Sequence, residues 1–230
     1  VTGGITFDNG TLQWLGTFNL ASTRAIALNA GGGTIDTNGF DTTISQSISG
    51  GGRLTKSGTG TLYLAPGNTY TGGTTINGGT ISIGVNTALG NATGGLTFNG
   101  GTLRTTADIS LNHAISLNGN GTIDNQAITR LNGVVSGPGD LTKTGGGVLA
   151  LIEASTFTGR LIVNQSVVVL QEGVPLGNIV LASGASVNFQ DFGGNNTYAG
   201  VISGDGRVAQ TGNGTLTLSG NNTYSGGTTV

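Results

Sequence analysis

Several residue types are scarce or missing in this chain of 230 residues. It has no cysteine, no methionine, one histidine and three prolines. The absence of cysteine excludes disulfides and thiolate chemistry, and His113 alone cannot form a zinc site or a histidine-based catalytic centre without partner residues. We therefore expect His113 to be a surface or coil-edge residue, and we expect no metal and no cofactor.

Charge is also scarce. Eight basic and ten acidic residues are scattered singly, make up 8% of the chain and give a net charge of -2. Nucleic acids and anionic membranes are bound by basic clusters, so we expect no nucleic-acid partner. No apolar run approaches the roughly 18 residues of a membrane-spanning segment, so we expect no membrane insertion by this segment.

The chain contains 46 glycines and 35% hydrophobic residues. That apolar content is sufficient for a core if it is well patterned, so we expect a folded chain. With so few charges, Thr, Ser, Asn and Gly must form most of the surface. In a long β-rich repeat, the lack of cysteine also suits an exported protein that crosses membranes unfolded.

A repeated unit organises the sequence. It spans residues 48–90, returns at 135–177 and begins again at 202–230, within what we interpret as a single repeat domain over 1–230. Lys56 and Lys143 mark equivalent positions 87 apart (143 minus 56). Repeats of this kind predict a solenoid or a similar array.

The third copy is shorter than the others by one discrete module. Its equivalent of Lys143 is Gln210, at an offset of 67, so the third copy falls short of the regular offset by 20 (87 minus 67). Deleting a coil leaves the neighbouring coils of a solenoid able to stack, whereas the same loss would break most globular cores. The offset of 87 is close to four such modules.

Within each module, apolar residues alternate with polar ones, as in Leu62-Tyr63-Leu64, and glycine-rich pairs follow. Period two indicates short strands with one buried face, and glycine permits tight corners. We predict an all-β fold, a parallel β-helix of about ten to eleven coils. Coils about 4.8 Å apart would give a rod on the order of 50 Å long. A β-sandwich or barrel with short strands is the structural alternative.

The phrases LTKSGTGTLYLAPGNTYTGGTTINGGTISIG, LTKTGGGVLALIEASTFTGRLIVNQ and VAQTGNGTLTLSGNNTYSGGTTV resemble the passenger-associated strand repeat of bacterial autotransporters. The second copy departs furthest, with Phe157 in place of tyrosine and Arg160-Leu161 in place of Gly-Thr. The resemblance implies a right-handed parallel β-helix, exported by a Gram-negative bacterium through the type V route and displayed at the cell surface or secreted. We expect the chain to be a piece of a longer passenger.

Paired carboxylates are the main enzymatic alternative, because parallel β-helices also host polysaccharide lyases and hydrolases. Asp36 and Asp124 occupy equivalent places in the repeat, and four coils would separate them by about 19 Å. Glycosidase pairs lie roughly 5 to 10 Å apart, so these two cannot cooperate. We interpret both as turn residues. Asp191 with Asp205, or Asp124 with Asp140, could meet across coils, but no basic cluster accompanies them.

Tyrosines are better candidates for contact with a partner. Tyr63, Tyr70, Tyr198 and Tyr224 could bind sugar or protein if exposed, although Tyr70 and Tyr224 share one repeat position with Phe157, which favours packing. We interpret the chain as a non-enzymatic structural stem that presents or spaces functional regions of a passenger. Two alternatives remain: an adhesin that binds a host-cell protein or glycan, and a matrix or filament component that associates end to end through its open strand edges.

Overall fold

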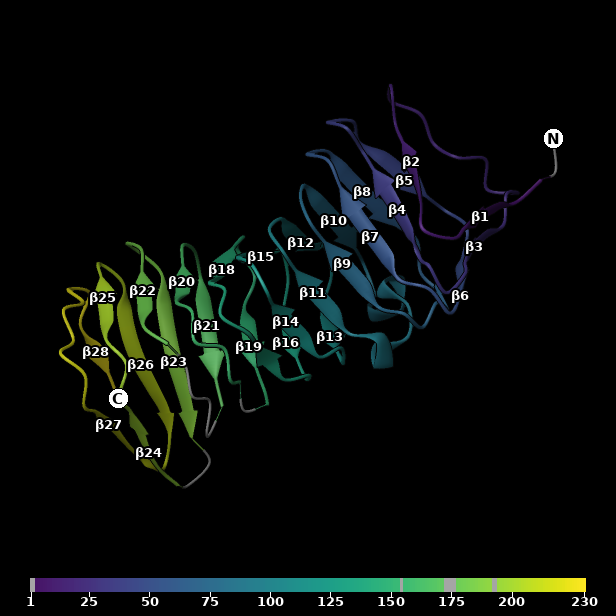
Figure 1. Cartoon of the computed structure of the whole chain (residues 1–230). Coiled ribbons are helices and arrows are strands. Elements are labelled where there is room, and N and C mark those ends of the chain that lie inside the picture. The colour runs from purple at the N-terminus through teal and green to yellow at the C-terminus, as the bar shows by residue number, and fades with distance from the viewer. Residues whose placement is uncertain (1–2, 154, 172–176, 192–193) are drawn as a thin grey trace.

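The computed structural model of the chain describes residues 3–153, 155–171, 177–191 and 194–230. These residues form a rod of stacked coils, with the two termini at opposite ends (Figure 1). The rod has about eleven coils, and strands of successive coils pair in parallel and in register. The prediction of a parallel β-solenoid is confirmed, and the sandwich or barrel alternative is wrong.

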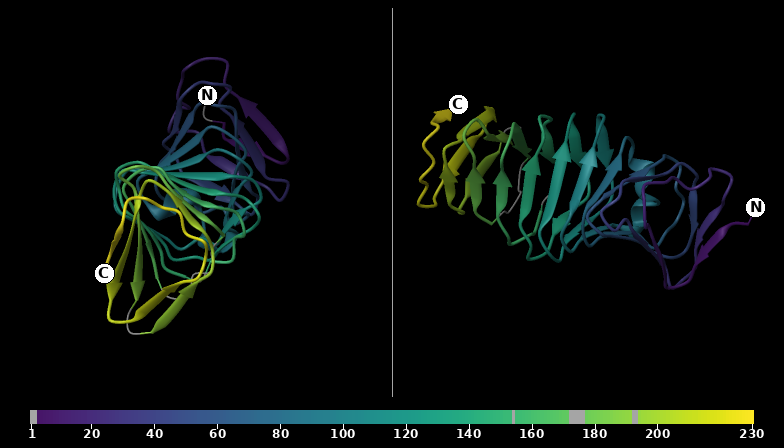
Figure 2. Two further views of the ribbon diagram at one scale, coloured as in Figure 1. Left: turned by 90° about the vertical axis from the view of Figure 1, so that its left-hand side faces the viewer. Right: turned by 90° about the horizontal axis from the view of Figure 1, so that it is seen from above.

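Each coil crosses three faces, which we number in the order in which the chain meets them (Figure 2). Face 1 contains β1 Ile5–Phe7, β3 Ile26–Leu28 and β6 Ile48–Gly50, then β13 Ile109–Leu111, β16 Thr129–Leu131, β19 Leu149–Leu151, β21 Val167–Leu170, β23 Ser186–Asp191, β26 Arg207–Gly212 and β28 Thr228–Thr229. Face 2 contains β2 Gly10–Gln13, β4 Gly33–Asp36, β7 Leu54–Ser57, β9 Thr74–Ile76, β11 Leu96–Phe98, β14 Ile115–Leu117 and β17 Val135–Ser136, then β24 Asn195–Tyr198 and β27 Thr215–Leu218. Face 3 contains β5 Thr42–Ile44, β8 Thr61–Leu64, β10 Thr80–Ile83, β12 Thr102–Thr105, β15 Gly121–Asn125, β18 Leu141–Thr144, β20 Leu161–Val163, β22 Ile179–Leu181 and β25 Ile202–Gly204.

Face 3 is continuous along nine strands, whereas face 1 is interrupted between β6 and β13. At that point the chain forms two short 3₁₀ turns, η1 Asn86–Leu89 and η2 Ala92–Gly94. Among the described residues there is no α-helix, and none of their helical segments is long and apolar enough to cross a membrane.

The interior consists of aliphatic columns that run along the rod. On face 3, Leu62, Ile81, Leu103 and Ile123 are successive register partners, and all four are fully buried. A buried leucine or isoleucine contributes roughly 1.5 to 3 kcal/mol. The alternation of apolar and polar residues in each strand therefore places the apolar side chains on the inward side, where in-register pairing stacks them into a fully buried column.

Amide side chains on the outside connect some coils. Asn99 donates a hydrogen bond to Asn77 Oδ1 at 2.8 Å, and Asn132 donates to Asn112 Oδ1 at 2.9 Å. These links add to the backbone pairing, because equivalent positions in stacked coils meet at the spacing of β-strands.

The repeated unit advances by one face with each copy. Lys56 lies in β7 on face 2, Lys143 in β18 on face 3, and Gln210 in β26 on face 1. The register carries Lys56 through Ile76 and Phe98 to Leu117. The pairing of Ser116 with Ser136 puts Gly137 opposite Leu117, four coils after Lys56 at an offset of 81 (137 minus 56). A further six positions reach Lys143 on the next face, so the offset of 87 is four coils plus one face rather than four coils alone.

The third copy follows the same rule with one coil fewer. Lys143 pairs with Val163, then Leu181, then Gly204, so three coils give an offset of 61 (204 minus 143). A further six positions again reach the equivalent residue, Gln210. The difference of 20 (81 minus 61) is therefore one coil, as the sequence predicts.

Candidate functional site

The distinctive polar residues of the repeat lie inside the rod, at its corners. Lys56 points inward at the end of β7 and is fully buried. Its ammonium group donates to the carbonyl oxygens of Ser57 at 2.7 Å and Gly58 at 2.8 Å, and it contacts Gly78 O of the next coil at 3.3 Å and Thr37 Oγ1 of the preceding coil at 2.8 Å. One side chain thus joins three successive coils.

Lys143 forms the same arrangement on face 3. It is fully buried, and its ammonium group donates to Thr144 O at 2.8 Å, Gly145 O at 2.6 Å and Gln165 O at 3.4 Å. An ammonium group has three donors, which matches three carbonyl oxygens turned into the corner. In the third copy, Gln210 is the substitute and donates to Gly214 O at 2.7 Å.

Burial opposes the charge of both lysines. Removal from water lowers the pKa of Lys56 from 10.5 to about 8, although Asp36 and Asp41 act in the opposite direction. Burial likewise lowers the pKa of Lys143 to about 8, against the influence of Asp124. Both lysines are therefore mainly ammonium ions at neutral pH. Backbone carbonyls hold both, the Thr37 hydroxyl also contacts Lys56, and none of the described carboxylates forms an ion pair with either lysine.

The second half of the repeat forms another buried polar cluster. Asn68 accepts a hydrogen bond from Ile48 N and donates to Ala65 O and Ala88 O, which lie in successive coils. Tyr70 is fully buried, its hydroxyl lies 2.6 Å from Thr74 Oγ1, and Thr74 donates to Leu89 O at 3.1 Å. The hydrogen bonds of these buried residues join one coil to the next.

In the second copy both hydroxyls of this cluster are lost together. Phe157 replaces the tyrosine and Leu161 replaces the threonine, and both are buried. In the third copy both are retained, since Tyr224 Oη lies 2.6 Å from Thr228 Oγ1. The paired change avoids an unpartnered buried hydroxyl, which costs about 1 to 3 kcal/mol. The packing role predicted for this repeat position is confirmed at Tyr70 and Phe157.

We expect Tyr70→Phe to lower the free energy of unfolding by about 1 kcal/mol, because Thr74 keeps its bond to Leu89. Thr74→Leu should cost about 2 to 3 kcal/mol, because it leaves the Tyr70 hydroxyl buried without an acceptor. The double variant should cost less than the sum of the two. A double-mutant cycle from urea titrations measures this coupling, and simple additivity would contradict it.

The carboxylates considered as catalytic pairs have separate structural partners. Asp36 accepts from Asn38 N at 2.9 Å, where Asn38 has a φ of 48°, so its turn role is confirmed. Asp124 instead pairs with Arg104 at 2.8 Å, and Asp140 with Arg160 at 2.7 Å, so the turn interpretation of Asp124 is wrong. Contact with Arg160 lowers the pKa of Asp140.

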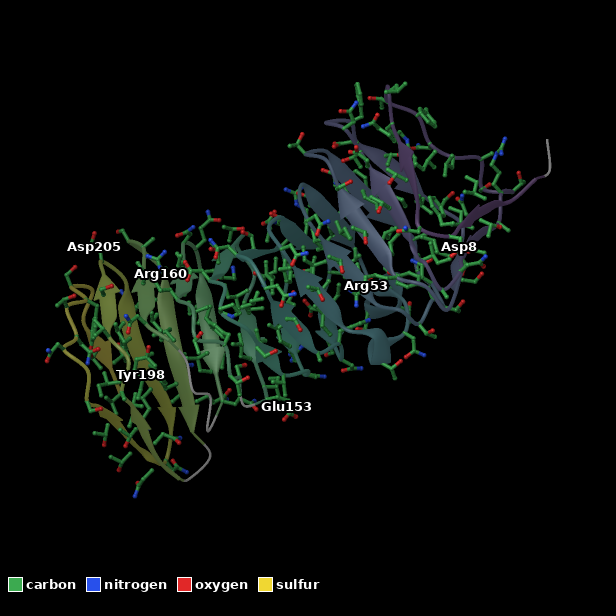
Figure 3. The ribbon with its side chains drawn as sticks, in the orientation of Figure 1. Asp8, Arg53, Glu153, Arg160, Tyr198 and Asp205 are labelled. Atoms are coloured by element: carbon green, nitrogen blue, oxygen red, sulfur yellow. The ribbon has the colours of Figure 1, made fainter. Side chains whose placement is uncertain are left out.

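Among the described side chains, no two of these carboxylates form a site. Asp36 lies on face 2 and Asp124 on face 3. Thr43, in the same coil as Asp36, is linked to Asp124 by four successive strand pairings, so the two carboxylates are four coils apart. Asp205 accepts from Ser225 at 2.9 Å, and the side chain of Asp191 lies outside the described residues. The labelled charged residues are spread along the rod (Figure 3). Within the described ranges, no group of three His, Asp or Glu side chains could hold a metal ion.

The prediction for His113 is correct about its place and wrong about its exposure. It follows β13 at the corner leading to β14, but its side chain is fully buried rather than at the surface. Its Nδ1 lies 3.1 Å from Asn86 Oδ1, and burial lowers its pKa. The alternating pattern Leu111-Asn112-His113 places it on the inward side, and this signal was available in the sequence.

Among the four tyrosines, Tyr63 is the most accessible, with 39% of its surface exposed on face 3. It stands between Thr43 and Ser82 in the outward column. Tyr198 is buried, and its hydroxyl donates to Gly177 O at 2.6 Å. Tyr224 is partly exposed, with its hydroxyl beside Thr228, so Tyr63 is the tyrosine best placed for contact with a partner.

The described residues form a parallel β-solenoid with the polar repeat residues at its corners, which is the class of fold that the resemblance to passenger repeats implies. The family model of the passenger-associated-transport-repeat matches residues 54–83, 141–165 and 208–230. The chain is 40% identical over 210 residues to the adhesin BmaC autotransporter of Brucella suis biovar 1. The alignment covers 89% of this chain and 6% of that relative. No solved structure matches the chain.

The chain is therefore an autotransporter passenger segment, built from passenger-associated transport repeats and related to an adhesin autotransporter. It spans only a small part of the length of its relative. The family matches begin at the strands that carry Lys56 and Lys143, and at the strand of Gln210. The repeat recognised from the sequence is confirmed.

Proposed function

We propose that this chain is a structural stem of a passenger, which presents or spaces functional regions at the surface of a Gram-negative cell. One observation carries the proposal: the residues that define the repeat, including Lys56, Tyr70 and Lys143, point inward and are fully buried. A repeat selected for a binding face would place its distinctive side chains outside. We propose that the chain has no catalytic role. We also propose that it is displayed or secreted through the type V route.

Removing one coil tests the stem function. The register pairs Thr102 with Thr122, so deletion of residues 102–121 removes one full turn. We expect a folded rod shortened by about 4.8 Å, because the remaining coils can restack. Small-angle scattering measures the length, and circular dichroism measures the β-structure.

A matched deletion of residues 102–111 supplies the control. It removes about half a coil, shifts every later strand to another face and should abolish cooperative folding. If both deletions unfold the rod, or if both are tolerated equally, coil stacking does not govern this chain and the stem function is not supported.

The alternative is a binding function, which the name of the adhesin relative favours. Tyr63 on face 3 is the residue that would take part, since it is exposed beside uncharged hydroxyl side chains. The stem function predicts no saturable binding of the chain to host-cell surfaces or glycan arrays. Saturable binding that is lost in Tyr63→Ser, and retained in Thr122→Ser on the same face, would favour the adhesin.

End-to-end association is a further alternative, because terminal strands present unpaired backbone groups. Among the described strands, β2 pairs only with β4, and β28 pairs only with β26. Scattering at increasing protein concentration distinguishes the two cases. A rod of constant length supports the stem, whereas growth by whole-rod increments or long fibres in micrographs supports the filament.

A further inference from the structure

The interruption of face 1 leaves one junction between coils with few hydrogen bonds. On the N-terminal side of this junction, the residues of η1 and its flank are hydrogen-bonded to Asn68 and Tyr70 of the preceding coil. Asn68 N donates to Thr87 O, Asn68 Nδ2 donates to Ala88 O, and Asn91 N donates to Tyr70 O. This side of the turn is held by both backbone and buried side chains.

The other side of η1 is held differently. Within the described ranges, the contacts that join η1 to the corner after β13 are made by Asn86 Oδ1 and by the backbone carbonyls of Leu89 and Gly90, which lie near the His113 ring. Asn86 Oδ1 accepts from Asn112 N at 3.3 Å and lies 3.1 Å from His113 Nδ1. Faces 2 and 3 remain paired through these coils, since β11 pairs with β9 and β14, and β12 with β10 and β15.

Besides Asn86, the groups near enough to accept a hydrogen bond from the His113 ring are the backbone carbonyls of Gly90 and Leu89, and neither meets the geometry of a hydrogen bond from Nε2. Because Asn86 Oδ1 is an acceptor, His113 Nδ1 carries the hydrogen in the neutral ring. Its Nε2 is buried and has no hydrogen-bond partner. Burial lowers the pKa of His113, and the backbone carbonyl groups of Gly90 and Leu89 offset this effect only in part. Protonation would place a full charge in this buried corner, which is unfavourable without a counter-charge.

No charged side chain in the described part of this corner offers that counter-charge. The η1 turn has neither acidic residues in its first turn nor basic residues in its last. Asp108, which precedes β13, accepts from Ile128 N in the next coil, and Arg130 of β16 is exposed on the outside. Tyr70 of the preceding coil is buried and neutral. None of the causes that shift the pKa of His113 is a charged side chain.

We propose that the junction between η1 and β13 is an acid-sensitive joint, which opens on face 1 when His113 is protonated while faces 2 and 3 stay paired. The direction follows from linkage. The pKa of His113 in the folded chain lies below its ordinary value of 6.5. As the pH falls below 6.5, the unfolded chain therefore binds a proton at His113 before the folded chain does. The junction is therefore stable above pH 6.5 and weakens as the pH falls below it.

Hydrogen exchange tests the joint directly. After correction for intrinsic rates, the amide of Asn112, which donates across the joint to Asn86 Oδ1, should lose tenfold or more of its protection between pH 7 and pH 5. Amides of β12 on face 3 should change less than twofold. Because His113 is the single histidine of the chain, its ring signals in NMR report the titration without ambiguity.

Two variants separate this proposal from a purely structural role of the residue. His113→Gln cannot titrate, and its amide can still donate to Asn86, so its exchange should not depend on pH. Asn86→Asp places a carboxylate beside the ring, so it should move the histidine titration to higher pH and protect the joint in acid. Unchanged acid sensitivity in His113→Gln, or titration of wild-type His113 near 6.5 with uniform exchange, would overturn the proposal.

Discussion

Lys143→Met is expected to lower the free energy of unfolding by about 3 kcal/mol, measured by urea titration with circular dichroism. The variant removes the group that three buried carbonyl oxygens share, and each unsatisfied carbonyl costs about 1 to 3 kcal/mol. Removing a desolvated charge returns roughly 3 kcal/mol for a pKa lowered from 10.5 to about 8, and less after allowance for solvent screening. The loss of hydrogen bonds exceeds this gain.

Lys143→Gln is the informative companion variant, because Gln210 occupies the same position in the third copy and donates to Gly214 O. It should cost about half as much as the methionine variant, since an amide supplies two donors in place of three. Arg130→Met is a matched control, in which an exposed cation is removed from face 1 and the change should stay within about 0.5 kcal/mol. A methionine variant as stable as the wild type would show that the corner needs no cation.

Lys56→Met should behave in the same way, with one additional consequence. The Lys56 ammonium group also contacts Thr37 Oγ1 in the preceding coil. Because a solenoid unfolds by separating neighbouring coils, this variant should loosen β4 from β7 more than Lys143→Met loosens the coils on face 3. Hydrogen exchange of the amides of residues 33–37 measures the difference.

The fold followed from the sequence because its signals are repeated many times. Alternation such as Leu62-Tyr63-Leu64 fixes the buried face of each strand, and the one-coil gap before Gln210 distinguishes a solenoid from a closed barrel. The rotation of the repeat from face to face was missed because the coils are unequal in length. Along the register from position 56 through 76 and 98 to 117, the successive offsets are 20, 22 and 19. An offset of 87 cannot be divided into coils and faces without that register.

The buried lysines were missed for a different reason. In Leu54-Thr55-Lys56 the alternation puts Lys56 on the inward side, yet lysine is almost never fully buried without a partner. Its partners here are backbone carbonyls at a glycine-containing corner. Because every residue has a backbone carbonyl, the sequence does not reveal which ones will accept a hydrogen bond from the lysine. The same preference for exposure gave the wrong expectation for the side chain of His113. An inward position in the strand pattern was in both cases a better guide than residue chemistry.

Stability should rise as the pH increases from about 8 to 10. The folded lysines release their protons near pH 8, whereas unfolded lysines keep them until about 10.5, so in this window the unfolded state binds more protons. Each lysine should contribute about 2 kcal/mol by pH 10, after allowance for solvent screening. Urea midpoints measured at constant ionic strength give the profile. From these two groups we expect little change between pH 7 and the start of the window.

The composition makes this profile simple to assign. The chain has no cysteine, and Lys56 and Lys143 are its two lysines, so these two side chains dominate the titration between pH 8 and the ionisation of tyrosine near pH 10. Above about pH 10 the sign reverses, because burial raises the pKa of Tyr70 and Tyr198 and only the unfolded tyrosines ionise there. A maximum near pH 10 is therefore expected.

The double variant Lys56→Gln, Lys143→Gln removes the two groups responsible and should abolish the rise while retaining the decline above pH 10. A lysine-acylating reagent provides an independent check: at pH 8 it should leave both lysines unlabelled until the rod is unfolded. Rapid labelling of either lysine in the folded chain, or a stability that falls between pH 8 and 10, would mean that the corners admit water and that the carbonyl cage does not hold the ammonium group.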